Sequence, residues 1–135
     1  MGKSRLILVD THVVLWLADG AAKLSPGARA AIDEERRNGR ALAISDITLA
    51  ELAASYGKRR YSLTVPFDIF LEETESRFAV IPITARIAAR TLALPASYPN
   101  DPADRLIGAT ALIHGLPLVT ADRAIRRSKA LRTIW

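Results

Sequence analysis

Short apolar runs alternate along the chain with longer segments that carry helix signals, and this alternation restricts the possible folds more than any other feature. The apolar runs predict strands over residues 6–9, 41–44, 79–83 and 116–119, and a last short strand could form over residues 132–135. Strands that alternate with helices favour an α/β domain whose parallel sheet is covered by helices on both faces. The order of the strands does not follow from this pattern.

Residues with special backbone preferences set the expected ends of the helices. Ser25-Pro26 and Asp101-Pro102 are helix starts, and Gly39 and Gly115 stand where C-terminal caps belong. The third helix is expected to be capped by Ser45 or Asp46, the fifth by Thr84, and the last to begin at Thr120 or Ala121. The expected helices before it cover residues 11–18, 26–38, 46–57, 66–76, 84–94 and 102–114, and residues 95–101 form a loop.

Length and composition fit one domain over residues 1–135, because 135 residues, half of them hydrophobic, can form one sizeable core. The net charge of +5 favours a polyanion partner such as nucleic acid, although a surplus of solvated arginine is equally compatible. The absence of cysteine excludes disulfides and thiolate chemistry, and it fits a reducing cytoplasm. No targeting segment is expected, since the first apolar run already ends at Asp10. No membrane span is expected either, because the longest stretch without charged residues, 106–121, contains His114 and is broken by Gly115 and Pro117.

Four acidic residues follow or flank the predicted strand ends. Asp10 ends the first strand, and Asp122 comes just past the fourth. Glu51 and Asp104 lie near the starts of two helices. Because the carboxyl ends of parallel strands open on one edge of a sheet, we expect these acids to converge there. Clustered carboxylates are ligands for Mg²⁺ or Mn²⁺, which can activate water for phosphodiester hydrolysis.

Each acid also has a purely structural interpretation. Asp10 could be a helix N-cap, and Asp122 could complement a helix dipole. Asp101 fits as an N-cap with Asp104 as its partner three residues later, so we assign the cap to Asp101 and the metal to Asp104. Glu51 is the most informative acid because its helix is apolar on almost every side, where a carboxylate needs a cation or hydrogen bonds.

Four motifs together resemble PIN-domain proteins, and most of all the VapC-type toxins of bacterial toxin–antitoxin pairs. They are Leu8-Val-Asp-Thr-His12, Ile47-Thr-Leu-Ala-Glu51, Asn100-Asp-Pro-Ala-Asp-Arg-Leu-Ile107 and Leu118-Val-Thr-Ala-Asp122. The resemblance spans nearly the whole chain, and the motifs keep the family's order. It implies a three-layer α/β/α sandwich with a mostly parallel central sheet.

The resemblance further implies Mg²⁺- or Mn²⁺-dependent endonucleolytic cleavage of RNA, with 5′-phosphate and 3′-hydroxyl products. It places the metal on Asp10, Glu51, Asp104 and Asp122, with Thr11 and Thr120 as polar support and Asp101 as an ambiguous extra carboxylate. Similar toxins are held inactive by a small cognate antitoxin and usually form homodimers, so an antitoxin and a second copy of the chain are the expected partners, besides RNA.

Basic residues and histidines complete the set of candidates. The possible phosphate contacts, which could equally be solvated, are Lys58, Arg59, Arg60, Arg105, Arg123, Arg126 and Arg127. His12 could act in acid–base catalysis, whereas His114 reads as a helix C-terminal residue. A receiver domain and a haloacid-dehalogenase-like phosphatase are disfavoured, because the first strand offers only Asp10 and His12 stands where a second aspartate would be needed. A non-catalytic RNA- or protein-binding module on the same fold remains the alternative.

Overall fold

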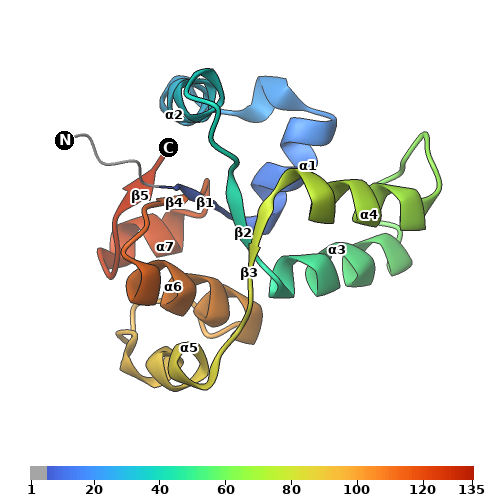
Figure 1. Cartoon of the computed structure of the whole chain (residues 1–135). Helices are drawn as coiled ribbons and strands as arrows, with labels where there is room; N and C mark the ends of the chain where they lie inside the picture. The colour runs from blue at the N-terminus through green and yellow to red at the C-terminus, as the bar shows by residue number, and fades with distance from the viewer. Residues whose placement is uncertain (1–5) are drawn as a thin grey trace.

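A computed structural model describes residues 6–135; the basic start of the chain, residues 1–5, lies outside the described part (Figure 1). Five strands form one fully parallel sheet in the order β3-β2-β1-β4-β5. Their bounds are β1 (Leu8–Val9), β2 (Ala43–Ser45), β3 (Ala79–Ile81), β4 (Leu118–Val119) and β5 (Thr133–Ile134). The first strand in the sequence is therefore the central strand of the sheet.

Seven α-helices and two short 3₁₀ helices connect the strands within residues 6–135. Several predicted caps are present: the hydroxyls of Ser25 and Thr84 accept amides of their own helices, and Gly115 ends its helix with φ 64°. Asp46 makes no side-chain cap bond, and the Ser45 hydroxyl accepts the amide of Ile47 instead. The helices are α1 (Thr11–Ala18), η1 (Ala21–Lys23), α2 (Pro26–Arg37), α3 (Ile47–Gly57), α4 (Phe67–Arg77), α5 (Ala85–Arg90), η2 (Thr91–Ala93), α6 (Pro102–His114) and α7 (Arg123–Ser128).

The sheet is apolar on both faces, as the sequence predicts. Val9, Ile44 and Val119 point into one cluster, which α1, α2, α3 and α4 cover. Leu8, Ala43 and Leu118 point into the other cluster, which α6 and α7 cover. Alternate residues of a strand face opposite sides, so each two- or three-residue strand supplies both cores. The expected α/β/α sandwich is confirmed.

Two helix boundaries differ from the sequence prediction by more than one residue. The helix expected to reach residue 94 leaves the α-form at Arg90 and continues as η2, because Leu94 must be extended before Pro95. The last helix does not begin at Thr120 or Ala121 but at Arg123, since the Asp122 carboxylate accepts the amide of Ile125 and caps the helix there. In addition, the strands are one or two residues shorter than the apolar runs.

Among residues 6–135, no helix combines the length and the apolar character that a bilayer crossing requires.

The central strand offers a test of the packing. Leu8→Ala removes a side chain that is 0% exposed at the middle of the sheet. We expect it to lower the free energy of unfolding by about 2–5 kcal/mol. Leu92→Ala makes the same change at a side chain that is 90% exposed, and it should leave stability within about 0.5 kcal/mol of the parent. Urea denaturation of both variants measures this; equal midpoints would contradict the described core.

Candidate functional site

The site lies at the carboxyl edge of the sheet and begins with Asp10, which directly follows the central strand. Asp10 is 4% exposed. Its Oδ1 accepts the amide of Thr11 at 2.9 Å, and its Oδ2 accepts the hydroxyl of Thr120, beyond β4, at 2.7 Å. The same carboxylate therefore caps α1 and binds across to the neighbouring strand, as the parallel register of β1 and β4 requires.

Glu51 reaches the same edge from α3. The hydroxyl of Thr11 donates to Glu51 Oε1 at 2.5 Å and lies 3.0 Å from the hydroxyl of Thr48. Burial raises the pKa of Glu51; the Thr11 hydrogen bond opposes this shift, and the charges of Asp10 and Asp101 add to it. Thr11 is thus the direct link between the acid after β1 and the acid of α3.

Asp101 and Asp104 come from the start of α6. The amide of Asp104 donates to Asp101 Oδ2 at 3.1 Å, which is the cap predicted for Asp101. One carboxylate oxygen each from Glu51, Asp101 and Asp104 lies within 4.8 Å of the others. Burial raises the pKa of Asp104 to about 7, with the nearby negative charges as further causes. An ordinary aspartate would be fully charged at that pH.

Asp122 stands beside this group but outside the 4.8 Å set. It caps α7 through Oδ1, and its amide donates to the Thr120 hydroxyl at 3.1 Å. Its charge contributes to the raised pKa of Asp104, which places it at the same edge. The structure therefore groups Glu51 and Asp104 most tightly with Asp101, and it sets Asp10 and Asp122 around them.

His12 is engaged with the backbone. Its Nε2 accepts the amide of Ala121 at 2.9 Å, and its Nδ1 lies 3.8 Å from Asp10 Oδ2. Its ring also packs against Trp16 with centroids 4.9 Å apart. These contacts make His12 a support for the loop that carries Asp122. His114 is an exposed last residue of α6, as expected.

Arg105 does not fit the role of a phosphate contact. Its guanidinium donates to the carbonyls of Thr91 and Tyr98 and to the side chain of Asn100, at 3.1–3.4 Å. The sequence could not show that this arginine ties the preceding loop to α6. The remaining basic candidates are exposed, at the end of α3 (Lys58, Arg59, Arg60) and on α7 (Arg123, Arg126, Arg127).

Sequence reasoning missed Thr48 and Tyr98. Thr48 is fully buried in α3 beside Thr11. Tyr98 is buried as well, and its hydroxyl donates to the main-chain carbonyl of Asp104 at 2.9 Å. The one signal that pointed to Tyr98 was Gly108, a glycine in the middle of a helix, where glycine is unfavourable without a packing reason.

The donor set has the chemistry of a site for a hard divalent cation. It offers only oxygen atoms from carboxylates and hydroxyls, the ligands that Mg²⁺ and Mn²⁺ prefer. Burial raises the pKa values of Glu51 and Asp104, and the negative charges of the neighbouring carboxylates raise them further. A bound cation would remove that repulsion.

Comparison with known proteins decides the family. The family model described as the PIN domain matches residues 7–131. The chain belongs to the PIN-domain family.

Relatives of this PIN-domain chain include VapC proteins. It is 38% identical over 131 residues to Ribonuclease VapC22 of Mycobacterium tuberculosis, covering 96% of this chain and 98% of that protein. Its fold is similar to VapBC2 from Rickettsia felis bound to a promoter DNA fragment, with a TM-score of 0.70, 20% identity and coverage of 96% and 97% of the two chains. DNA-bound VapBC from Salmonella typhimurium is similar too, with a TM-score of 0.68, 24% identity and the same coverage.

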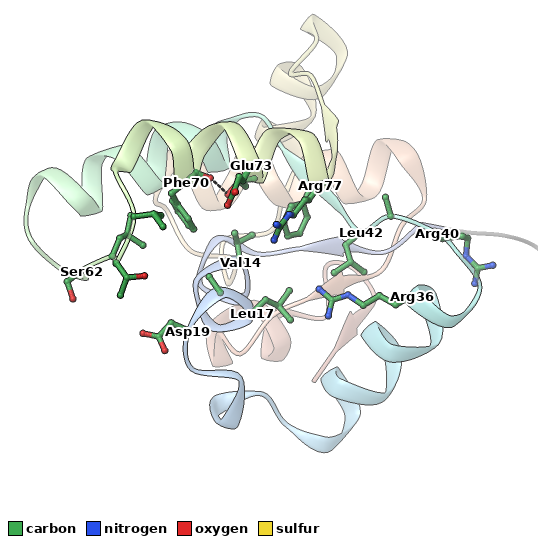
Figure 2. A pocket seen from close by; sticks show the side chains of 17 residues that line it. Val14, Leu17, Asp19, Arg36, Arg40, Leu42, Ser62, Phe70, Glu73 and Arg77 are labelled. Atoms are coloured by element: carbon green, nitrogen blue, oxygen red, sulfur yellow. Dashed lines mark hydrogen bonds between the residues drawn. The ribbon is translucent and has the colours of Figure 1, made fainter.

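This PIN domain also has a groove of about 720 Å³, whose lining residues are drawn in Figure 2. It runs between α1, the end of α2, the α3–α4 connection and α4. Its floor is apolar, with Val14, Leu17, Leu42 and Phe70, and its lining also includes Arg36, Arg40, Arg77, Asp19 and Glu73. The groove thus contains none of the candidate acids, and the two features are distinct surfaces.

The raised pKa of Asp104 predicts a pH dependence of stability. A carboxyl group whose pKa rises on folding, here from 3.8 to about 7, favours the folded state when protonated, so stability should fall as pH rises across that window. Because the group is half exposed, we expect about 1–2 kcal/mol rather than the full value of the shift. Asp104→Asn should flatten the loss between pH 4 and pH 7 in urea denaturation with EDTA. A parent profile equally flat over that window would contradict the clustering of charge.

Proposed function

We propose that this PIN-domain chain is a divalent-metal-dependent endoribonuclease and the toxin component of a toxin–antitoxin pair. The observation that carries the proposal is the meeting of Glu51, Asp101 and Asp104 within 4.8 Å at the carboxyl edge of the sheet, with Asp10 and Asp122 beside them. The relative that is 38% identical over nearly the whole chain is a ribonuclease, which supports the same reading.

The residues proposed to hold Mg²⁺ or Mn²⁺ are Asp10, Glu51, Asp104 and Asp122. Asp101 caps α6 and also lies within 4.8 Å of Glu51 and Asp104. A divalent ion there would supply activation of water and stabilisation of the charge that develops on the phosphate. Thr120 and Thr11 orient the Asp10 and Glu51 carboxylates by donating to one oxygen of each. The other oxygen of Asp10 accepts the amide of Thr11.

A bound divalent cation should change the protonation of Asp104 more than that of the other acids. Its carboxyl holds a proton over part of the population near pH 7, because its pKa is raised to about 7. Neutralisation of the surrounding negative charge lowers that pKa, so occupation of the site should release protons. Calorimetry in buffers of different ionisation heat would detect this release directly.

RNA is proposed as the substrate, and the exposed basic residues are its proposed contacts. Lys58, Arg59 and Arg60 extend from the end of the helix that carries Glu51. Arg123, Arg126 and Arg127 lie on the helix that Asp122 caps. Both groups are therefore attached to elements of the site. Phosphate contacts of this kind should make RNA affinity fall as salt rises.

Substitution of the acids tests the enzymatic activity. Asp10→Asn or Asp104→Asn should lower cleavage of single-stranded RNA by about 100-fold or more, since each removes a charge from the cation site. Asp33→Asn makes the same change on the exposed side of α2 and should leave the rate unchanged. EDTA should abolish cleavage, and Mn²⁺ should restore it, with 5′-phosphate and 3′-hydroxyl products.

The alternative, a non-catalytic RNA- or protein-binding module, makes the opposite prediction. Such a module would bind RNA without cleaving it, in the presence of either metal. Equal cleavage by the parent and Asp10→Asn would point to a contaminating nuclease and would reject the proposed site. Cyclic 2′,3′-phosphate products would reject hydrolysis by a metal-activated water.

The proposed inhibitory partner is a small cognate antitoxin, since several structures with this fold are toxin–antitoxin complexes. The groove beside α1 and α4 is the proposed docking surface. It would suit a partner segment with an apolar face, because Val14, Leu17, Leu42 and Phe70 line it. A homodimer and a cytoplasmic location also remain predictions.

Two exposed apolar residues provide a matched test of this docking surface. Val65 lines the groove and is 42% exposed, whereas Ile69 is 41% exposed and lies outside the lining. Val65→Glu should weaken capture of the small protein encoded beside this gene by about tenfold or more, and Ile69→Glu should not. Retention of the partner by both variants in co-purification would exclude the groove.

A further inference from the structure

Tyr98 lies beneath the acidic group, in the loop that leads into α6. Its side chain is 1% exposed, and its hydroxyl donates to the main-chain carbonyl of Asp104 at 2.9 Å. Its pKa is raised well above the usual range of tyrosine by burial and by the charges of Asp10, Asp104 and Asp122. The hydroxyl is the donor of this hydrogen bond, which ties the loop to the first turn of α6.

Gly108 provides the space for this hydroxyl. A Cβ atom at residue 108 would stand 2.4 Å from Tyr98 Oη and 2.7 Å from its Cζ, closer than side chains tolerate. Glycine is unfavourable inside a helix, because it gains backbone freedom on unfolding. The close approach of Tyr98 to α6 accounts for this glycine, and it fixes the distance between the loop and the helix.

Arg105 ties the same loop from its other side. Its guanidinium donates to the carbonyls of Thr91 and Tyr98, so α6 and the loop before it are joined in both directions. Asp104 lies between Arg105 and the Asp101 cap, and its carbonyl is the acceptor for Tyr98. The side chain of Tyr98 thus holds the backbone of Asp104, and its hydroxyl donates to the main chain and not to a carboxylate oxygen.

We propose that Tyr98, seated against Gly108, is a positioning residue that fixes the first turn of α6 and thereby sets the Asp104 carboxylate relative to Glu51. The expected effect of Tyr98 on the binding of metal and RNA rests on the proposed function. Its effect on the first turn of α6 rests on the geometry alone. Carboxylates that repel one another move apart unless the backbone is held, so a loosened turn should widen the site.

Tyr98→Phe is the sharpest variant, because it keeps the buried ring and removes only the hydroxyl. The amides of Asp104 and Arg105 should exchange with solvent about threefold to tenfold faster, as expected for loss of one net hydrogen bond. Mn²⁺ affinity by calorimetry should fall by about threefold or more, and kcat should fall while KM for RNA changes little.

Tyr61→Phe is the matched control. Its hydroxyl also donates to a helix carbonyl, that of Leu52 in α3, at 2.8 Å. This variant loses the same type of bond and should show a comparable loss of stability. It should leave exchange at Asp104 and Arg105 unchanged.

Gly108→Ala approaches the same contact from the other side and separates two explanations. If Gly108 were an ordinary helix residue, alanine would stabilise α6. The positioning role predicts the opposite: a lower denaturation midpoint, faster exchange at Asp104 and weaker Mn²⁺ binding, because Cβ displaces the tyrosine hydroxyl.

The outcomes separate this inference from the proposed function. Unchanged exchange at Asp104 in Tyr98→Phe, or a stabilised Gly108→Ala protein, would overturn the positioning role whatever the chain binds. Altered exchange with an unchanged Mn²⁺ affinity would also overturn it, because Tyr98 would then be merely structural. A parent protein that binds no Mn²⁺ would reject the proposed function, while the exchange data would still decide the role of Tyr98.

Discussion

Mutual repulsion of carboxylates at one edge of a parallel sheet is the constraint on which the rest of this structure depends. The parallel register brings the residues after β1 and β4 to the same level, and α3 and α6 pack against each other so that Glu51 and Asp104 meet above them. Burial and, after it, the neighbouring negative charges raise the pKa of Asp104, so its charged form is unfavourable in this arrangement. Hydroxyl donors and helix starts around the site offset part of that cost.

Helix capping and site formation use the same residues. Asp10, Asp101 and Asp122 each accept an amide at a helix start through one oxygen. Each helix start also has a positive dipole end, which favours a negative charge there. A cap and a cation ligand are therefore not competing interpretations, because one carboxylate has two oxygens with several lone pairs. The caps explain how three like charges can be held in defined orientations near one another.

The alternation of apolar runs predicted the two-sided parallel sheet, because each short strand must supply both cores. It also predicted which acids follow the strands. It could not predict the order of the strands, or that Asp101 lies within 4.8 Å of Glu51, since that distance depends on how α6 packs on α3. The bonds of Arg105 could not be predicted either, because its acceptors belong to a loop whose path no local pattern specifies. Only the glycine at residue 108 hinted at a close tertiary contact.

The acidic edge draws on both layers of the fold, and this has a consequence for its rigidity. Asp10, Thr11 and Glu51 belong to elements that cover one face of the sheet, whereas Asp104 and Tyr98 belong to the segment that covers the other. Relative movement of the two layers would therefore change the separation of Glu51 and Asp104 directly. The contacts that oppose such movement are main-chain bonds at the start of α6 and hydroxyl bonds around Thr11, not ion pairs within the site. A site of like charges can be made rigid only in this way, by neutral donors that fix the backbone and leave the carboxylate charge for a ligand.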